Sequence, residues 1–361
     1  MSNVRAIVFT GDGRHELRTF PKPDPPERGL LLKVEAVGMC GSDVAQMNGH
    51  LMVSSSVFPV VPGHETIGRV ESISPGGDWA VQEGDRVAVD EVLRCGTCRH
   101  CRAASTRCER LMIYGYSFPA DDGVGLWGGF GEYMAILPGT NLVKATQHVS
   151  AEELTLFEPL ANAINWNNIA RVTPGDTVVV QGPGHQGLCC VVAARMAGAA
   201  EVIVTGTNRD TLRLEAALTV GATQTIDVDS TDPIERVAET TEGAMADVVM
   251  DLADGTTATV PLAIQLARRG GQVLLAGLKH GKPVNGLISD QIVSKMLRIS
   301  GGAGATPETM RRAVHLLGAG RVPTKELLGE VYSMDDVNTA MAALQRKIPD
   351  KDSIRVGLKL N

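Results

Sequence analysis

The sequence predicts an α/β protein with two domains and a returning tail. We place a barrel-like β domain at residues 1–150, a doubly wound parallel-sheet domain at residues 151–300, and a C-terminal segment at residues 301–361 that returns to the first domain. Three observations predict this arrangement. The chain has 361 residues, which is more than one ordinary core contains. Its first part consists of short alternating runs, and its second part alternates apolar strands with amphipathic helices.

The β character of the first domain comes from short runs in which apolar and polar residues alternate. Residues 5–9 form the first strand, and residues 31–36 and 68–73 show the alternation. Glycine and proline are frequent between these runs, as expected where turns join strands. These features predict an all-β or barrel-like domain.

Around residue 150 the pattern changes to alternating strands and helices. Ser150, followed by Ala151 and two glutamates, is a helix-start signature. The predicted strands are Thr177–Gln181, Glu201–Thr205, Gln224–Asp227, Asp247–Met250 and Gly271–Ala276, with helical patterns at Asp210–Val220 and Ala258–Arg268. Regular alternation of this kind predicts a parallel, doubly wound sheet. The tail adds helices near Pro307–Leu317 and Met334–Leu344 and a closing strand at Ser353–Leu360.

Composition and charge argue against several classes of function. Hydrophobic residues make up 43% of the chain and charged residues 21%, which is ordinary for a globular protein. The formal net charge of −7 argues against a nucleic-acid partner, which needs a clustered basic face. No apolar stretch has the length of a membrane span, and the first ten residues read as a strand, not as a secretion signal. We therefore expect a cytoplasmic protein without nucleic-acid or membrane partners.

Four of the seven cysteines are clustered, in the pattern Cys95-x2-Cys98-x2-Cys101-x6-Cys108. Clustering in a chain without a secretion signal indicates metal binding and not a disulfide framework. Four thiolates close a tetrahedral shell around Zn²⁺ and leave no open position, so we predict a structural zinc site. The adjacent pair Cys189-Cys190 lies in an apolar helical run and is interpreted as two small buried side chains.

The first strand of the predicted parallel sheet runs directly into the turn Gly182-Pro-Gly184-His-Gln-Gly187 and then into a helical pattern. In such a turn the first glycine permits a tight bend, the second lets a pyrophosphate approach the backbone, and the third allows the helix to pack on the strand. We therefore predict that Gly182, Gly184 and Gly187 bind a dinucleotide at the helix start. Within the turn, His185 and Gln186 either reach a phosphate or the nicotinamide, or are solvated side chains.

The end of the second strand of this sheet bears on the choice of dinucleotide. An acid there would hold the ribose 2′-hydroxyl and favour NAD, but the run is Thr205-Gly-Thr-Asn-Arg-Asp210. Arg209 could pair with a 2′-phosphate, and Thr207 and Asn208 could hydrogen-bond to it, which slightly favours NADP over NAD. Asp210 is either a helix-start acid or a partner of the ribose.

A second set of metal-ligand residue types is scattered along the chain. Cys40 follows one predicted strand, His64 follows a short apolar run, and Glu158 precedes the first strand of the parallel sheet. Taken singly, each has an ordinary interpretation as a buried cysteine, a turn histidine or a helix-start glutamate. Together, one cysteine, one histidine and one carboxylate supply three ligands and leave a position for substrate or water, which is typical of a catalytic zinc.

These motifs together resemble the zinc-containing medium-chain dehydrogenases, the superfamily of alcohol, sorbitol and threonine dehydrogenases, over essentially the whole chain. The matching pieces are Cys40-Gly-Ser-Asp43, Gly63-His-Glu65, Gly84-Asp-Arg-Val87, the four clustered cysteines, Gly128-Gly-Phe-Gly-Glu-Tyr133, Phe157-Glu-Pro159, the glycine turn and Gly221-Ala222. The resemblance implies a GroES-like β-barrel catalytic domain and a Rossmann cofactor domain. It further implies that Cys40, His64 and Glu158 bind a catalytic zinc. Glu65 would exchange with these ligands or lie behind them, and Asp43 would orient His64.

The resemblance also implies a proton path and cofactor contacts. Ser42 would pass the proton of the substrate hydroxyl toward the cofactor ribose. Family members commonly carry a relay histidine at the position of Ala45, and nearby His50 is either its substitute or a surface histidine. Backbone contacts to the ribose and carboxamide are expected from Leu252, Gly277 and Leu278, and a contact to the pyrophosphate from Arg355. Relatives form dimers or tetramers, so we expect a homodimer or homotetramer that uses segments Gly271–Leu278 and Val293–Ile299.

The predicted reaction is reversible hydride transfer between an alcohol and NAD(P), with a secondary or cyclic alcohol favoured and a polyol possible. Several bulky side chains either line an apolar substrate pocket or belong to the ordinary core; they are Leu51, Phe58, Tyr114, Tyr116, Phe118, Trp127 and Trp166. Two alternatives remain. One is a zinc-independent quinone or enoyl reductase of the same fold, and the other is a non-enzymatic zinc protein that binds a dinucleotide.

Overall fold

The computed structural model describes residues 2–50, 53–103, 108–302, 304–349 and 351–360. The chain forms two compact units: unit 1 comprises Met1–Glu158 and Met310–Asn361, and unit 2 comprises Pro159–Thr309. These divisions fall later in the chain than the predicted boundaries at residues 150 and 300. No helix in the ranges described here is both long and apolar enough to cross a bilayer.

Unit 1 is built on a seven-stranded sheet with the order β16-β17-β3-β4-β5-β9, in which β8 also pairs with β3. Its strands are β3 (Leu30–Met39), β4 (Glu65–Ile73), β5 (Arg86–Val89), β8 (Tyr133–Ile136), β9 (Leu142–Lys144), β16 (Glu330–Ser333) and β17 (Val356–Lys359). The predicted alternating runs 31–36 and 68–73 lie in β3 and β4, which pair antiparallel. The side chains of β3 and β5 are nearly all buried, because the core covers this part of the sheet.

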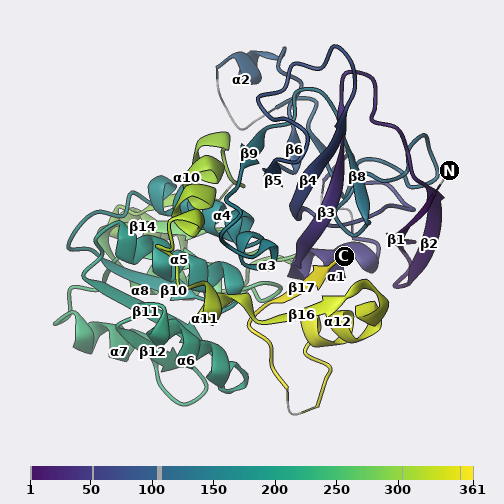
Figure 1. Cartoon of the computed structure of the whole chain (residues 1–361). Helices are drawn as coiled ribbons and strands as arrows, with labels where there is room; N and C mark the ends of the chain where they lie inside the picture. Colours follow the sequence, from purple (N-terminus) through teal and green to yellow (C-terminus); the bar gives the residue numbers. More distant parts are fainter. Residues whose placement is uncertain (1, 51–52, 104–107, 303, 350, 361) are drawn as a thin grey trace. The chain divides into compact units, whose positions relative to one another are not determined.

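Unit 1 has further strands and helices outside this sheet (Figure 1). They are β1 (Asn3–Phe9), β2 (His15–Pro21), β6 (Val92–Leu93), β7 (Met112–Ile113), α1 (Gly41–Met47), α2 (Arg99–Arg102), α3 (Ala151–Leu154), α11 (Thr324–Leu328) and α12 (Val337–Leu344). The end of the chain belongs to this unit because β17 pairs antiparallel with β3, with Val356 opposite Met39. Figure 1 shows β17 in yellow beside β3.

Unit 2 contains a six-stranded, all-parallel sheet with the order β12-β11-β10-β13-β14-β15. The strands are β10 (Thr177–Gln181), β11 (Glu201–Gly206), β12 (Gln224–Asp227), β13 (Ala246–Asp251), β14 (Ala267–Leu275) and β15 (Arg298–Gly301). The helices of unit 2 are α4 (Phe157–Ile169), which begins at the boundary, α5 (His185–Met196), α6 (Thr211–Thr219), α7 (Pro233–Thr240), α8 (Thr259–Leu266) and α9 (Ser289–Lys295). The next helix, α10 (Pro307–Gly318), lies mostly in unit 1, which resumes at Met310. Counted along the chain, the strand order is 3-2-1-4-5-6, the order of dinucleotide-binding folds.

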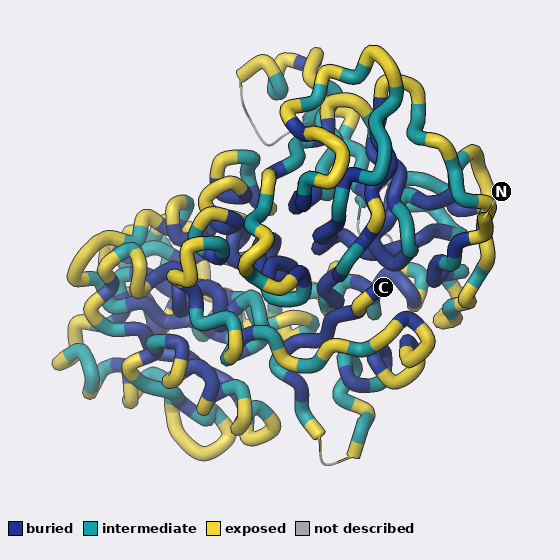
Figure 2. Tube along the Cα trace, viewed as in Figure 1, coloured by how far each residue is buried: buried dark blue, intermediate teal, exposed yellow. Residues whose placement is uncertain are grey.

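The α/β architecture predicted from the sequence is confirmed. The central strands β10 and β11 contain continuous runs of valine and isoleucine, as expected for strands that are buried on both faces of a sheet. Figure 2 shows buried segments among more exposed helices in this unit. One predicted helix is shorter than expected. The pattern at 258–268 ends as α8 at Leu266, because Ala267 already pairs with Ala246 as the first residue of β14.

Candidate metal centres and dinucleotide turn

The clustered cysteines of unit 1 point at one another. The sulfur atoms of Cys95, Cys98, Cys101 and Cys108 all lie within 4.8 Å of one another, and the sulfurs of Cys95 and Cys101 are 3.9 Å apart. Four thiolates bound tetrahedrally to zinc at about 2.3 Å stand about 3.8 Å apart. The spacing of this cluster is therefore close to that of a closed zinc shell.

Backbone N–H groups already face these sulfurs. The N–H of Cys95 donates to the sulfur of Cys108 at 3.3 Å, and the N–H of Cys101 donates to the sulfur of Cys98 at 3.4 Å. Hydrogen bonds from the backbone of Thr97 and Cys98 lower the pKa of Cys95 to about 5. Such donors stabilise the thiolate, which is the form that binds a metal.

Two of the three predicted catalytic ligands, Cys40 and His64, come together with Glu65 at the end of β3 and the start of β4. The sulfur of Cys40, a ring nitrogen of His64 and a carboxylate oxygen of Glu65 all lie within 4.8 Å of one another. Cys40 caps the N-terminus of α1, directly after β3. Gly63 precedes His64 with φ of +98°, and a Cβ there would lie 2.4 Å from the ring of Phe130, so only glycine fits this approach to the site.

Asp43 connects the two loops of this group. Its Oδ2 accepts a hydrogen bond from the backbone N–H of Cys40 at 2.7 Å, and its Oδ1 lies 3.4 Å from Nδ1 of His64. Burial lowers the pKa of His64, but Tyr116 and Asp43 outweigh it and raise the pKa well above its ordinary value. The Nδ1 edge of the ring thus faces Asp43, as expected for a histidine that presents Nε2 to a metal.

Glu65 has an additional partner that joins the C-terminal segment to this site. It forms an ion pair with Arg355, and both side chains are completely buried. Arg355 also donates to Oγ1 of Thr155 at 2.7 Å and to its carbonyl oxygen at 3.1 Å. These contacts account for both terminal nitrogens of the guanidinium within unit 1. The predicted contact of Arg355 with a pyrophosphate stays a prediction.

Glu158, the predicted third ligand, lies outside the 4.8 Å group but within electrostatic reach of it. Burial raises the pKa of Glu158 well above its ordinary value, and the charges of Glu65 and Glu91 raise it further. Glu91 is similarly affected, since burial and the charge of Asp90 raise its pKa to about 7. Several carboxylates therefore crowd around one thiol and one imidazole, and this donor set fits a divalent cation of the zinc type.

In unit 2, the three predicted glycines differ in what surrounds them. Gly182 has φ of +102°, and a Cβ on Gly187 would lie 2.0 Å from the carbonyl oxygen of Gly182. A Cβ on Gly184, in contrast, would meet nothing closer than Nη1 of Arg213 at 4.0 Å. The turn therefore needs its first and third glycines for its own geometry and leaves the middle one open. That opening fits a dinucleotide phosphate at the start of α5, which begins at His185 and continues with Gln186.

The strand order places this turn where ligands bind in such sheets. The chain continues from β10 to β11 on one side and returns to β13 on the other, so the sheet changes direction beside Gly182. The N–H of Leu252 bonds to the carbonyl oxygen of Gln181 at 2.9 Å, and a Cβ on Gly277 would lie 2.5 Å from the carbonyl oxygen of Ala253. The predicted cofactor residues Leu252, Gly277 and Leu278 thus lie in loops at the same carboxyl edge.

The polar residues that follow β11 form hydrogen bonds within unit 2. Asp210 accepts hydrogen bonds from the backbone N–H of Thr207 at 3.0 Å and from its hydroxyl at 2.7 Å, so it caps the following helical turn. Asp210 therefore makes the contacts expected of a helix-start acid. Asp229 accepts a hydrogen bond from the N–H of Asn208 at 3.0 Å. Arg209 lies in the same turn, next to Asp210.

Most of the bulky side chains considered for a substrate pocket pack against residues outside the group around Cys40 and His64. Tyr114 stacks on Phe118 at 5.5 Å between ring centroids, and Phe118 stacks on Trp127 at 5.2 Å, within the core of unit 1. The ring of Phe58 covers Gly11 near the first hairpin. In unit 2, Trp166 lies against Gly302, and Leu51 falls outside the described residues. Tyr116 differs, because its hydroxyl donates to Oγ of Ser42 at 3.2 Å.

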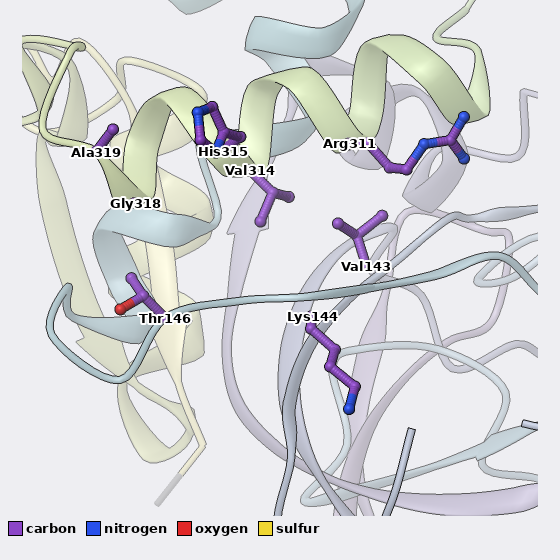
Figure 3. A pocket seen from close by; sticks show the side chains of 8 residues that line it. All are labelled: Val143, Lys144, Thr146, Arg311, Val314, His315, Gly318 and Ala319. Atoms are coloured by element: carbon purple, nitrogen blue, oxygen red, sulfur yellow. The ribbon is translucent and has the colours of Figure 1, made fainter. Parts of the chain in front are cut away.

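A separate hollow of about 370 Å³ lies in unit 1 beside β9 and α10 (Figure 3). It includes Lys144, Arg311 and His315, which suggests an anion at first sight. Figure 3 shows that these side chains point in different directions. Lys144 is also paired with Asp85 at 2.8 Å. The hollow therefore lacks the converging charges of an anion site.

Three side chains near these sites were not singled out as site residues by the sequence. Tyr116 was considered only as a bulky residue, although it bonds to Ser42 and lies 3.4 Å from Nδ1 of His64. Glu91 comes two residues after the end of β5, and an acid just beyond a buried strand and before the cysteine cluster was an available signal. Arg213 lies one helical turn into α6, and its approach to Gly184 depends on tertiary packing.

Comparisons with known proteins agree with this description. Residues 26–147 match the alcohol dehydrogenase GroES-like domain, and residues 187–319 match the zinc-binding dehydrogenase family. A probable alcohol dehydrogenase of Mycobacterium tuberculosis is 38% identical, over 94% of this chain and 94% of the relative. A sorbitol dehydrogenase of Bacillus subtilis is 31% identical, over 96% of this chain and 95% of the relative. The structure of a zinc-binding dehydrogenase from Sinorhizobium meliloti 1021 bound to NADP is 27% identical, with a TM-score of 0.87 and full coverage of both chains.

Proposed function

This chain belongs to the zinc-containing medium-chain dehydrogenases, and on that premise we propose that it oxidises a secondary alcohol reversibly, with NADP as the hydride acceptor. Family membership makes it a zinc-type, alcohol dehydrogenase-like oxidoreductase. The observation that carries the proposal is the convergence of Cys40, His64 and Glu65 within 4.8 Å, in a chain that also has the open glycine turn.

In the proposed site, Cys40 and His64 hold a zinc ion together with one carboxylate. That carboxylate is Glu158 by family resemblance, whereas Glu65 is nearer in the described geometry. Bound zinc would act as a Lewis acid on the substrate oxygen. Asp43 orients the imidazole, and Ser42 accepts the proton that the substrate hydroxyl loses. The four clustered cysteines hold a second, structural zinc.

The metal content tests this assignment against the two alternatives. A dehydrogenase with both sites should contain about two zinc ions per subunit, a binding protein with the cysteine cluster alone about one, and a zinc-independent reductase none. Elemental analysis of the purified protein measures this number. A value near two, together with loss of alcohol oxidation on chelation, supports the proposal. Full alcohol oxidation by metal-free protein refutes it.

NADP is proposed because no acid occupies the end of β11, where the side-chain types of Thr207, Asn208 and Arg209 are ones that can pair with a 2′-phosphate. Asp229 argues against NADP, because its negatively charged carboxylate lies beside Asn208 and would repel a 2′-phosphate there. The ratio of kcat/KM for NADP and NAD decides the question, and a strong preference for NAD refutes the choice.

The favoured substrate is a secondary alcohol, cyclic or open-chain, and a polyol is the alternative that the sorbitol dehydrogenase relative suggests. Since the half-buried Phe118 and Trp127 stack on each other against the core, they do not support a large apolar pocket. A panel of cyclohexanol, 2-butanol, sorbitol, threonine and a primary alcohol, each with both cofactors and with and without chelator, tests the substrate class. A preference for sorbitol or threonine would refute the proposal that the substrate is a secondary alcohol with a single hydroxyl group.

We also propose a homodimer or homotetramer formed through the outer edge of the unit 2 sheet. β15 is the last strand of that sheet, and the chain just before it carries exposed apolar side chains: Val293 in α9 is 75% exposed, and Met296 at the end of α9 is 58% exposed. Exposed apolar side chains beside an unpaired strand edge are typical of association surfaces. Val293→Lys should shift the sedimentation coefficient toward the monomer, and an unchanged assembly would contradict this surface.

A further inference from the structure

The hydroxyl of Tyr116 lies between two residues that the proposed reaction uses. It donates a hydrogen bond to Oγ of Ser42 at 3.2 Å and lies 3.4 Å from Nδ1 of His64. The side chain is 5% exposed. Backbone hydrogen bonds of Tyr116 to Ile113 at 3.1 Å and to Val57 at 2.9 Å fix the segment that carries it. The position of the hydroxyl is therefore determined by the fold of unit 1.

The contact with Ser42 restricts the rotation of the serine hydroxyl. The tyrosine hydroxyl carries one proton, which it donates to Oγ of Ser42 in this contact. A serine hydroxyl has two lone pairs and one proton. Since Tyr116 occupies one lone pair of Ser42, the other lone pair and the proton are directed toward remaining partners. In the proposed reaction, this second lone pair of Ser42 accepts a proton from the substrate, and the proton of Ser42 is the one passed onward.

The contact with His64 acts on the opposite edge of the ring from the metal position. Asp43 and Tyr116 each lie 3.4 Å from Nδ1, and the Tyr116 and His64 ring centroids are 5.6 Å apart. Two polar groups at Nδ1 restrict the rotation of the imidazole and keep Nε2 available as a ligand. The same hydroxyl thus touches both the proton-transfer residue and a metal-binding residue.

We propose that Tyr116 is a positioning residue for the dehydrogenase reaction, whose hydroxyl fixes the direction of the Ser42 hydroxyl and the rotation of the His64 ring. The proposal rests on the proposed function, because both contacts matter only if Ser42 and His64 have the roles given above. Ala45 occupies the position of the family's relay histidine and offers no polar group of its own side chain to the path. Tyr116 supplies a polar contact to Ser42 that an alanine cannot supply.

Tyr114 provides a matched control two residues away. Its hydroxyl lies 2.8 Å from Oγ1 of Thr140 and accepts a hydrogen bond from the N–H of Leu137 at 2.7 Å. Like Tyr116, it is a buried tyrosine of unit 1, but its hydroxyl contacts Thr140 and Leu137, which have no role in the proposed site. Removing either hydroxyl costs a buried hydrogen bond, so only effects on the site distinguish the two variants.

The experiment compares Tyr116→Phe with Tyr114→Phe in the full-length, zinc-loaded protein. For the best alcohol of the panel, we expect Tyr116→Phe to lower kcat at least 10-fold and to change KM less than 3-fold. Zinc competition with a chromophoric chelator is the second readout. We expect the more weakly held zinc to bind about 10-fold more weakly in Tyr116→Phe, as is common when a partner of a ligand is lost. Tyr114→Phe should leave both quantities within 2-fold while lowering the thermal midpoint.

A Ser42→Ala background tests whether Tyr116 acts through the serine. There, adding Tyr116→Phe should cause little further loss of kcat, and an additional loss as large as that in the wild-type background overturns this route. Wild-type kcat and zinc affinity in Tyr116→Phe, or equal losses in Tyr114→Phe, overturn the positioning role. If the wild type oxidises no alcohol, the proposed function fails. The zinc competition still tests the His64 contact, because it needs no substrate.

Discussion

The buried ion pair between Glu65 and Arg355 gives the most quantitative prediction. Arg355 lies just before β17, whereas Glu65 begins β4, so the pair links the returning C-terminal strand to the candidate metal centre. Both side chains are 0% exposed, and Arg355 also makes two hydrogen bonds to Thr155. Arg355→Met keeps a long side chain but removes the charge and these donors. It leaves the Glu65 carboxylate buried without its cation.

The cost follows from this burial. Removing one partner of a buried pair destabilises a protein by roughly 3–5 kcal/mol, because the remaining charge stays desolvated. For a domain of 150–250 residues, each kcal/mol lowers the thermal midpoint by about 2–4 °C. We therefore expect Arg355→Met to lower the midpoint by roughly 6–20 °C in metal-free protein. A bound dication near Glu65 compensates its charge, so the loss should be smaller in the zinc-loaded protein.

Thermal unfolding followed by circular dichroism measures this effect, with Lys359→Met as a control. Lys359 lies on the same strand and pairs with Glu152 at 3.1 Å, but its side chain is 58% exposed, so its loss should change stability by less than about 1 kcal/mol. Glu65→Gln added to Arg355→Met should restore part of the stability, since it removes the uncompensated charge. A fall of under 2 °C in Arg355→Met, or no recovery in the double variant, would refute the reasoning.

Three further predictions concern the cysteine cluster, the acid response and the cofactor. Cys95→Ser should reduce the zinc content from about two ions to about one per subunit by elemental analysis, and an unchanged content would contradict the cluster as a zinc site. Burial raises the pKa of Glu35, but hydrogen bonds and charge from Arg86 and Arg69 outweigh it and lower the pKa. The resulting stabilisation is present above the unfolded-state pKa and is lost as the pH falls, so urea midpoints at pH 7 and pH 4 should differ less in Glu35→Gln. Asn208→Asp should raise kcat/KM for NAD relative to NADP at least 10-fold, and a constant ratio would show that the ribose lies elsewhere.

The sequence was sufficient wherever the determining interactions are local. The strand Thr177–Gln181 was predicted with its observed bounds, because a buried parallel strand needs an uninterrupted apolar run and the glycine turn ends it. The four cysteines are close in sequence, so their spacing alone predicted that they could share one ion. Gly182 and Gly187 were assigned correctly to turn geometry for the same reason, since the bend needs a positive φ and a missing Cβ within one short segment.

Contacts between distant segments were not predictable in this way. Arg355 and Glu65 are 290 residues apart, and no local pattern shows that an arginine near the end of the chain is buried. Tyr116 and Phe118 are neighbours in sequence with similar hydrophobicity, but one lies at the candidate site and the other in an aromatic stack. Their difference depends on which side of the loop after β7 faces α1, and this is set by tertiary packing.

The assignment of the third metal ligand illustrates the same limit and how charge resolves it. Geometry alone favours Glu65, whose carboxylate lies within 4.8 Å of the other two donors. However, Glu65 already compensates a completely buried guanidinium, and drawing it to the metal would leave Arg355 without its anion. Glu158 is buried with its pKa raised by burial and by the neighbouring carboxylates, so a dication bound there would stabilise its charged form. While Arg355 holds Glu65, electrostatics therefore favours Glu158 as the ligand. In the proposed site, Glu65 would then be the exchanging carboxylate, because its ion pair with Arg355 competes with binding to a metal.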